Sequence, residues 1–468
     1  MAEQMLLKVR EIEITSSNPF QNDSLNRQES AEVLTQFVTS VNDPMVVCID
    51  APWGQGKTTF LKMWKQHLEN NNIPTLYFNA WENDFSDDAL VSLIGEISSA
   101  IREISKSGDE TQAQKYLKNV KKFGINILKR GIPVAAKIAT AGMVDLDTIT
   151  EETISSFSEL IAKEQLEKYE KSKSALVDFR DALSALASSI TNPDDPKPLV
   201  FIIDELDRCR PNFSIEILEK AKHFFNVENI VFVLAADKTQ LGHSIKAIYG
   251  SELNVNGYLR RFIDFDYVLP PPEKGIFVKA LFRKFSFNEY FAGKSGSELY
   301  YEGEHALTMF TDLFELYRLT LREQEHCCSL LSLSIRTTPS NYKLYPLLLC
   351  FLIVLKVKEP DMYKSFIIEE IDSSELLDYL KNKEGAEKLL DSHYGKLLEA
   401  YIVTCKPYTH ASDQSQSKYH ETIGSTSSTE SEKERAAKIL SFLNDWNWDH
   451  HVLSGLVSKI EIASRFKT

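Results

Sequence analysis

Short apolar runs, rich in β-branched and aromatic residues, recur along the chain and predict buried strands. They read MVVCID at 45–50, TLYFNAWEN at 75–83, LVFII at 199–203 and NIVFVLAAD at 229–237. Segments with the apolar spacing of helices lie between these runs. Continuous apolar runs separated by helices are typical of a parallel sheet that is covered on both faces. The pattern therefore predicts an α/β fold with helices on both sides of a parallel sheet.

Helical periodicity dominates the rest of the chain. Residues 89–195 are strongly charged and show no strand pattern, and the segment after the prolines at 270–272 is helical in pattern almost to its end. Residues 409–434 are rich in Ser and Thr and poor in apolar side chains, which predicts a mobile linker. The expected parts are an N-terminal lead-in at 1–44, an α/β core at 45–88 and 196–272, a helical insertion at 89–195, a helical domain at 273–408, the linker at 409–434 and a helical cap at 435–468.

The composition is that of an ordinary globular protein, with 43% apolar and 26% charged residues in 468 positions. A chain of this length predicts two or three domains. The net charge of −14 argues against a protein that coats nucleic acid. The six cysteines show no zinc-ligand spacing, and residues 1–15 lack a signal-peptide core. We therefore expect a cytoplasmic protein with reduced thiols and no transition-metal site.

Two further stretches bear on contact with a membrane or with nucleic acid. The longest uncharged apolar run, at 344–355, has twelve residues and is too short to cross a bilayer, so it predicts a buried helix. Residues 115–137 hold seven basic residues and no acidic one. This basic segment is either the solvated face of a helical insertion or a surface for a partner such as nucleic acid. A membrane is not an expected partner.

The segment APWGQGKT at 51–58 matches the phosphate-binding P-loop pattern except at its first position, where Ala51 replaces glycine. It lies between a predicted strand and a predicted helix, which is where backbone N–H groups can surround a phosphate. The lysine neutralises β- and γ-phosphate oxygens, and Thr58 offers a hydroxyl to Mg²⁺. The tryptophan either packs against the fold or stacks on adenine. The nucleotide-binding residues expected from this loop are Trp53, Gly54, Gln55, Gly56, Lys57, Thr58 and Thr59.

An acidic pair follows the strongest predicted strand. Asp204 stands directly after LVFII, where a carboxylate can hold Mg²⁺ and its water shell. Glu205 comes next and is the candidate general base that polarises the attacking water. The alternative for this pair is an N-cap at a strand-to-helix turn. Asp207 and Arg208 are either further site residues or a salt bridge that closes the turn.

In five blocks the sequence resembles the KAP family of P-loop NTPases. The blocks read APWGQGKTTFLKMW, YFNAWEND, FIIDELDRCRP, NIVFVLAADKTQL and YLRRFIDFDYVLP, and LSIRTTPSNYK is a candidate sixth. The resemblance implies a P-loop core with an extra strand between the P-loop strand and the strand that carries the acidic pair. It also implies Mg²⁺-dependent ATP hydrolysis coupled to assembly or signalling. Many relatives carry transmembrane helices in the insertion, whereas this insertion is polar, and some bacterial relatives resemble components of antiviral defence.

Four residues outside the P-loop and the acidic pair are candidates to complete the site. Asp237 ends a predicted strand and is either a sensor of the γ-phosphate or the cap of the next helix. Arg260, Arg261 and Arg336 are candidates for the arginine that stabilises charge in the transition state, often supplied by a neighbouring subunit. Each is otherwise a surface charge. A homo-oligomer with sites completed between subunits is therefore expected.

The leading hypothesis is an ATP hydrolase that acts as a regulatory or assembly switch, with a protein partner that carries the effector activity. A nucleotide-gated sensor that binds nucleic acid through 115–137 is the alternative. A scaffold that binds ATP and scarcely hydrolyses it is a third hypothesis, and the complete set of Lys57, Thr58, Asp204 and Glu205 argues against it.

Overall fold

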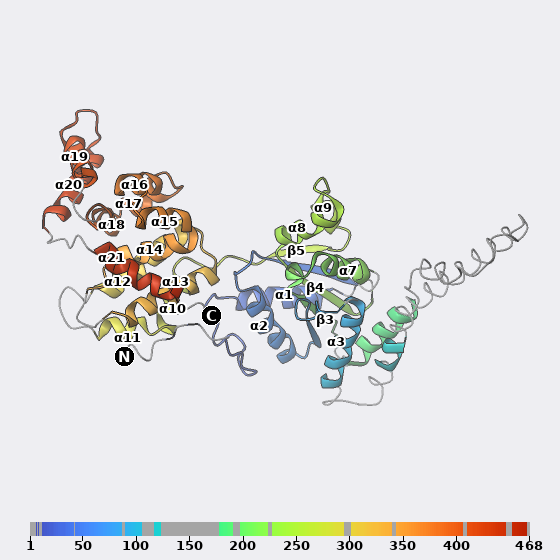
Figure 1. Cartoon of the computed structure of the whole chain (residues 1–468). Helices are drawn as coiled ribbons and strands as arrows, with labels where there is room; N and C mark the ends of the chain where they lie inside the picture. The colour runs from blue at the N-terminus through green and yellow to red at the C-terminus, as the bar shows by residue number, and fades with distance from the viewer. Residues whose placement is uncertain are drawn as a thin grey trace, which may run out of the picture. The chain divides into compact units, whose positions relative to one another are not determined.

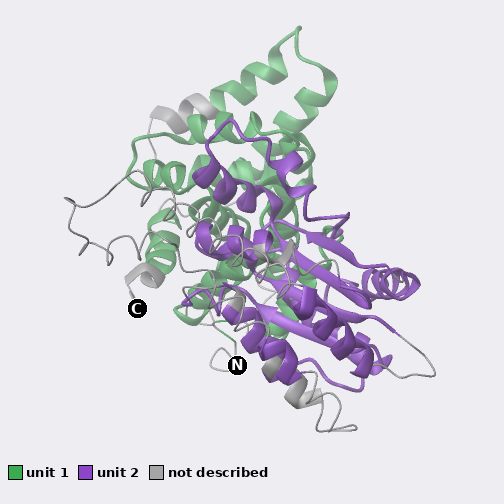
Figure 2. Cartoon of the chain, turned by 90° about the vertical axis from the view of Figure 1, so that its right-hand side faces the viewer, with its two compact units in different colours: residues 1–12, 271–468 green, residues 13–270 purple. Residues whose placement is uncertain are grey.

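A five-stranded parallel sheet forms the centre of the first of two compact units in the computed structural model (Figures 1 and 2). This unit spans residues 13–270, and the second consists of 1–12 with 271–468. The structure describes residues 6, 8, 12–41, 43–86, 89–104, 117–122, 177–190, 197–222, 227–293, 301–338, 343–405, 410–445 and 452–465.

The strand order in the sheet is β2-β3-β4-β1-β5, with every neighbouring pair parallel. The carboxyl ends of the strands therefore lie at one edge of the sheet. Strand β4 lies between β1 and β3, which confirms the extra strand that the resemblance implied between the P-loop strand and the acidic pair. The strands are β1 (Met45–Asp50), β2 (Thr75–Asn79), β3 (Leu199–Asp204), β4 (Ile230–Ala236) and β5 (Phe265–Val268).

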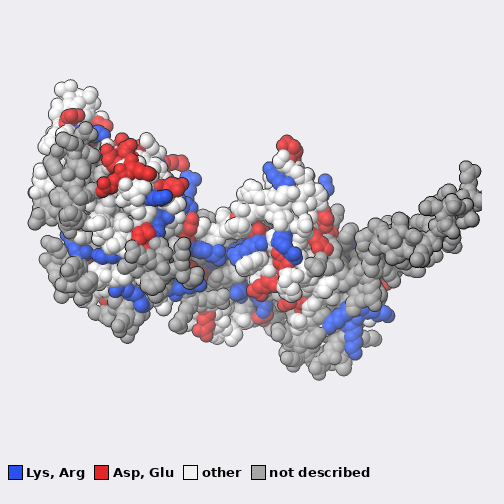
Figure 3. Space-filling model, in the orientation of Figure 1, with Lys and Arg blue, Asp and Glu red and all other residues white. Residues whose placement is uncertain are grey.

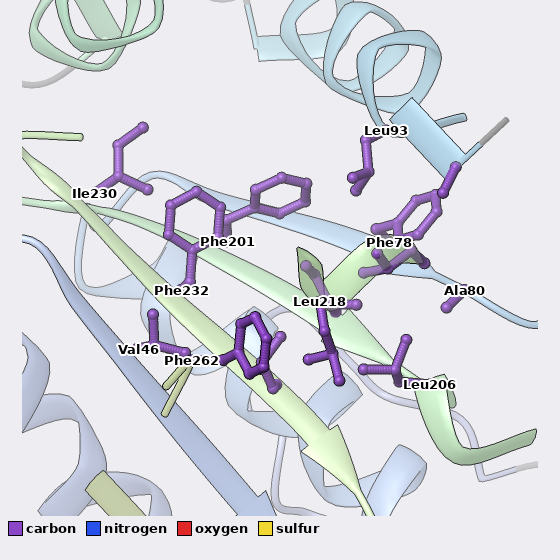
Figure 4. Close-up of a cluster of buried hydrophobic side chains, with 14 of the residues drawn as sticks. Val46, Phe78, Ala80, Leu93, Phe201, Leu206, Leu218, Ile230, Phe232 and Phe262 are labelled. Carbon is purple, nitrogen blue, oxygen red and sulfur yellow. The ribbon is translucent and has the colours of Figure 1, made fainter. Parts of the chain in front are cut away.

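Helices cover both faces of this sheet. The helices α3 (Ala89–Ile104), α7 (Pro211–Lys222) and α8 (Lys238–Tyr249) contribute to one hydrophobic cluster together with alternate residues of the strands, part of which is shown in Figure 4. Helices α1 (Gln28–Ser40) and α2 (Lys57–Asn70) bury their apolar side chains outside this cluster and pack on each other. Since successive side chains of a strand face opposite sides, α1 and α2 lie on the other face.

Two parts of the expected insertion belong to the core of the sheet unit. In α3, Leu93 and Ile97 pack in the same cluster as Phe201 and Phe232, and Phe179 from the helical residues 177–190 joins them. Residues 89–104 and 177–190 are therefore part of the layer that covers the sheet and not a solvated insertion. Most of the basic segment 115–137 lies outside the described residues. Its described part, 117–122, is helical.

The second unit is helical. Its centre is α14 (Pro346–Lys358), in which every residue from Leu347 to Leu355 is at most 1% exposed, so the buried helix predicted from the apolar run at 344–355 is confirmed. The other helices are α10 (Ile276–Lys284), α11 (Phe287–Ala292), α12 (Glu302–Leu316), α13 (Leu321–Arg336), α15 (Pro360–Ile367), α16 (Ser373–Lys381), α17 (Ala386–Leu390), α18 (His393–Thr404), α19 (His410–Gly424), α20 (Glu430–Asp445) and α21 (Val452–Arg465).

The structure differs from the sequence analysis at residues 409–434. In place of the expected linker this segment holds α19 and the start of α20. Thr429 and Glu432 exchange hydrogen bonds as a capping box at the N-terminus of α20, and Tyr419 in α19 donates to the buried carboxylate of Glu399 at 2.7 Å. These few polar anchors stabilise helices whose composition alone favours a linker.

Within the described part of the chain, no helix combines the length and apolar character that crossing a membrane requires.

Candidate nucleotide-binding site

The loop between β1 and α2 has the backbone geometry that its glycines require. Gly54 and Gly56 have φ values of 75° and 77°, in the left-handed region that favours glycine. Ala51 is not among the residues with positive φ, so this position does not need the glycine of the usual pattern. Its N–H instead bonds to the Ala236 carbonyl at the end of β4, 3.4 Å away. The departure in the motif therefore leaves the loop intact.

Lys57 begins α2 and is buried beneath this loop. Its Nζ donates to the carbonyl oxygen of Ala51 at 2.9 Å and lies 3.7 Å from Asp207 Oδ2. The ammonium group is thus held between the start of the loop and the acidic turn that follows β3. The structure thus places Lys57 at the loop where the sequence predicts a phosphate-binding lysine.

Asp204 ends β3 and its side chain is fully buried. Burial raises the pKa of its carboxyl group, and hydrogen bonds from Tyr77, Thr58 and the Glu205 backbone oppose this shift. The Tyr77 hydroxyl donates at 2.7 Å from the neighbouring strand β2. Asp204 is therefore desolvated and surrounded by donors that favour its charged form.

Glu205 lies beside the P-loop threonine. Thr58 Oγ1 donates to Glu205 Oε1 at 3.3 Å, although the two residues are 147 positions apart in sequence. The φ of Glu205 is 58°, which places a buried non-glycine residue in the left-handed region. Such a conformation costs about 1–3 kcal/mol and is found mostly at functional sites. The turn after β3 thus aims the Glu205 carboxylate at the start of α2.

Arg208 pairs with Glu205 in the same turn. Its Nη1 lies 2.7 Å from Glu205 Oε1, and its guanidinium carbon is 5.7 Å from the centre of the half-exposed Trp81 ring. The sequence analysis left Arg208 open between a site residue and a salt bridge. The structure shows a salt bridge made with the candidate base itself, so a cation is present beside the site within one subunit.

Asp207 joins the P-loop to the end of β4. Its Oδ2 accepts hydrogen bonds from the Trp53 indole N–H and from the Asp237 backbone N–H, the latter at 2.9 Å. Trp53 is 44% exposed, and its indole nitrogen is fixed by this carboxylate. Asp207 is thus an anchor that the sequence alone did not assign.

Asp237 caps α8. Its Oδ1 accepts from the backbone N–H groups of Thr239 and Gln240, and its Oδ2 accepts from the Trp53 N–H at 3.1 Å. Of the two roles that the sequence left open, the structure shows the capping contact. It adds a contact with the P-loop through the Trp53 N–H.

The donor set of this site fits Mg²⁺ and a nucleoside triphosphate. Thr58 and Asp204 present the hydroxyl and carboxylate oxygens that Mg²⁺ prefers, and few protein ligands suffice because phosphates and water complete the shell. In the described residues no group of three or more His, Cys, Asp or Glu side chains could hold a metal by itself.

Buried polar atoms without a partner in the described structure include Asp207 Oδ1, Gln55 Oε1 and Arg27 Nη1.

Two of the three predicted arginines lie in the sheet unit and have no described contact with the site. Arg260 and Arg261 follow the short helix α9 (Val255–Leu259) and are exposed, and the Arg261 guanidinium lies 5.9 Å from the Tyr258 ring centre. No described contact joins either arginine to the P-loop or the acidic pair. Arg336 ends α13 in the helical unit.

Thr59 follows Thr58 in the first turn of α2 and is partly buried.

In the described part of the basic segment, the lysine side chains face solvent or are partly exposed. In residues 117–122 the side chains of Leu117 and Val120 pack in the hydrophobic cluster, while Lys118 and Lys122 are exposed. The face of the molecule in Figure 3 shows some groups of acidic and some groups of basic side chains. This arrangement fits a solvated helix face as well as a binding surface.

A glycine-rich loop between a parallel strand and a helix, with an acidic pair at the end of another strand of that sheet, defines a P-loop NTPase. The profile of the KAP family P-loop domain matches residues 27–336. The chain belongs to this family, whose members are P-loop NTPases.

No curated protein sequence matches the chain. One solved structure that it resembles is the ORC2 protein of Aeropyrum pernix in complexes with ADPNP and ADP. The two share 12% sequence identity with a TM-score of 0.29, over 94% of this chain and 95% of that one.

Proposed function

We propose that the chain hydrolyses ATP with Mg²⁺ at the P-loop. The observation that carries this proposal is the hydrogen bond of Thr58 to Glu205, together with the contact of Thr58 with Asp204. It brings the hydroxyl of the phosphate-binding loop to both carboxylates of the acidic pair. A loop that only binds a nucleotide does not need a general base at this place, so the arrangement favours hydrolysis over a passive scaffold.

Each residue then has a distinct task. Lys57 and the N–H groups of the loop bind the β- and γ-phosphates. Thr58 and Asp204 would hold Mg²⁺, which would supply positive charge against the phosphate oxygens. Glu205 accepts a proton from the water that attacks the γ-phosphate. Arg208, paired with Glu205 Oε1 at 2.7 Å, restrains the orientation of that carboxylate.

We further propose that hydrolysis drives a regulatory or assembly switch in an oligomer that works with a partner protein. The exposed side chains of Trp81 and Phe85 support a protein-facing surface after β2, since they are 53% and 84% exposed. In the described part of the chain, the exposed Arg260 and Arg261 make no contact with their own P-loop, and they are suited to reach the site of a neighbouring subunit.

One experiment tests the enzyme and the switch together. The ATPase rate and the particle mass of the purified chain are measured with and without Mg²⁺-ATP, and again with added DNA. The proposal expects Mg²⁺-dependent phosphate release and a larger particle in ATP. A monomer that turns over at full rate would overturn the oligomeric switch. Salt-dependent DNA binding that stimulates turnover would favour the nucleic-acid sensor instead.

A mixing experiment locates the arginine. Glu205→Gln subunits are combined with subunits that carry Arg260→Ala and Arg261→Ala. If the arginines act between subunits, each preparation is inactive alone and the mixture recovers activity. Arginine variants with the wild-type rate would exclude this role and leave Arg208 as the candidate arginine of the site.

A further inference from the structure

Arg27 is a buried arginine beside the P-loop. It stands directly before α1, and only 4% of its surface is exposed. Its Nη2 donates to the backbone carbonyl of Gln55 at 3.3 Å. Burial lowers the pKa of the Arg27 guanidinium, and the charges of Asp23 and Tyr267 oppose that shift. Burying a charged side chain costs free energy, and one hydrogen bond to a carbonyl offsets only part of this cost. A functional role would explain why Arg27 is buried here.

The contact with the Gln55 carbonyl bears on the direction of the Gly56 N–H group. The Gln55 carbonyl and the Gly56 N–H belong to the same peptide unit, and the described backbone contains no cis peptide bond. In a planar trans peptide the C=O and N–H groups point in opposite directions. Arg27 binds the Gln55 carbonyl from outside the loop. The Gly56 N–H of the same peptide therefore points toward the inside of the loop, where the phosphate would bind.

This peptide needs an external restraint. Gly54 and Gly56 flank Gln55, and both have positive φ. Glycine has little steric preference between positive and negative φ, so the plane of the peptide between Gln55 and Gly56 can rotate at small cost. In the described structure no side chain or backbone carbonyl accepts the Gly56 N–H, which leaves the contact with Arg27 as the observed restraint on this unit.

We propose that Arg27 is a positioning residue of the P-loop, which orients the Gly56 N–H toward the bound phosphate by holding the Gln55 carbonyl. The inference rests on the proposed nucleotide site and adds a residue that the P-loop motif does not contain. A cation at the carbonyl also polarises the peptide and makes its N–H a stronger donor.

The hydrogen-bonding state of Arg27 distinguishes this role from simple packing. Its Nη1 is buried without an acceptor in the described structure, and the side-chain oxygen of Gln55 is buried without a donor. An arginine that only stabilised the fold would have its N–H groups satisfied, because an unpaired buried donor is destabilising. A buried polar group without a partner, as in Arg27, is typical of functional positions.

The test uses Arg27→Met, which keeps the length and apolar stem of the side chain and removes the charge. Replacing a poorly satisfied buried cation by an apolar side chain leaves the melting temperature unchanged or raises it. The affinity for Mg²⁺-ATP and for inorganic tripolyphosphate should fall by the same factor, about tenfold for one weakened hydrogen bond to a charged group. Arg27→Lys should recover part of the loss. Gln28→Met, at the exposed neighbouring position, is the matched control and should change neither quantity.

The outcomes separate this inference from the proposed function. If the wild-type chain binds Mg²⁺-ATP and Arg27→Met binds tripolyphosphate equally well, the positioning role is wrong while the nucleotide site stands. A loss for ATP without a loss for tripolyphosphate would also overturn it, since Arg27 would then contact the base or ribose. A wild-type chain that binds neither ligand would contradict the proposed function itself.

Discussion

Tyr77 and Asp204 are joined by a hydrogen bond of 2.7 Å between the phenol oxygen and Asp204 Oδ2. The two residues belong to the adjacent parallel strands β2 and β3, where Tyr77 lies opposite Ile202. Burial raises the pKa of the Tyr77 hydroxyl, and the nearby Asp204 charge raises it further, so Tyr77 remains a donor. The bond orients the carboxylate that we assign to Mg²⁺, in the way that outer residues orient ligands in metal sites.

Tyr77→Phe should therefore raise the Mg²⁺ concentration needed for half-maximal ATP hydrolysis by about tenfold, since second-shell partners typically contribute 10–100-fold in metal affinity or activity. The rate at saturating Mg²⁺ should change less. A Mg²⁺ titration of the ATPase rate measures both quantities, with Asp204→Asn as the reference for complete loss of the ligand. An unchanged Mg²⁺ requirement in Tyr77→Phe would show that Asp204 does not depend on this bond.

Glu205→Gln should keep ATP bound and slow its hydrolysis about 100-fold or more, because the amide cannot accept a proton from water. Thr58 and Arg208 still surround the side chain, so the fold of the turn should persist. Single-turnover hydrolysis and ATP affinity are measured on the same preparation. Hydrolysis at the wild-type rate would assign the base to another residue, and Asp207, with its unpaired Oδ1, would be examined next.

The buried Glu399 should contribute to the stability of the helical unit in a pH-dependent way. Burial alone would raise its pKa, but Lys381, Arg435 and the Tyr419 hydroxyl lower it below the ordinary 4.5. A lowered folded-state pKa means that the charged form stabilises the fold above pH 4.5 and that this contribution is lost as pH falls through the folded-state pKa. Glu399→Gln should cost about 3 kcal/mol at pH 7, as when one partner of a buried ion pair is removed.

Urea unfolding of the full chain at several pH values measures this contribution. The difference between wild type and Glu399→Gln should be largest near pH 7 and should shrink in acid. A difference that stays constant down to the folded-state pKa would mean that the charge of Glu399 is not what stabilises the unit. Glu384→Gln removes a carboxylate whose side chain is 89% exposed and serves as the matched control.

The cysteines should be unreactive in the folded chain. All six are buried, and burial raises the pKa of Cys48 to about 12 and that of Cys327, Cys328 and Cys350 well above the ordinary value. Labelling with a disulfide reagent at pH 8 should modify no thiol in native buffer and six in urea. Rapid labelling of any thiol without denaturant would show that its surroundings are more open than the structure has them.

The P-loop residues and Asp204 lie close together as the sequence predicts, because the position of each is set by the residues next to it in the chain. A buried strand ends, a glycine-rich loop turns the chain, and α2 begins at Lys57, so the loop geometry follows from about ten consecutive residues. Asp204 directly follows the strongest predicted strand, and in a parallel sheet the carboxyl ends of the strands meet at one edge. The P-loop fold and the proximity of Thr58 to the acidic pair could therefore be inferred without coordinates.

The supporting residues depend on contacts between distant segments and could not be inferred. Tyr77 and Asp204 are 127 positions apart, and their pairing requires the strand order and the register of β2 on β3. Arg27 meets the P-loop 28 positions away only because α1 packs on α2. The sequence does not predict α19, because the few contacts that stabilise it, such as the hydrogen bond of Tyr419 to Glu399, cannot be recognised in a Ser/Thr-rich composition.

The most direct test of the account is Mg²⁺-dependent phosphate release from ATP by the wild-type chain and by Lys57→Ala, measured side by side. The lysine meets the phosphates, and the polar contacts described for its side chain are with Ala51 and Asp207, so the variant should stay folded, with a lower melting temperature because the buried Asp207 loses its cation. The account predicts that the wild type releases phosphate only with Mg²⁺ and that folded Lys57→Ala neither binds ATP nor releases phosphate. Equal ATP affinity and equal phosphate release in the two proteins would contradict it.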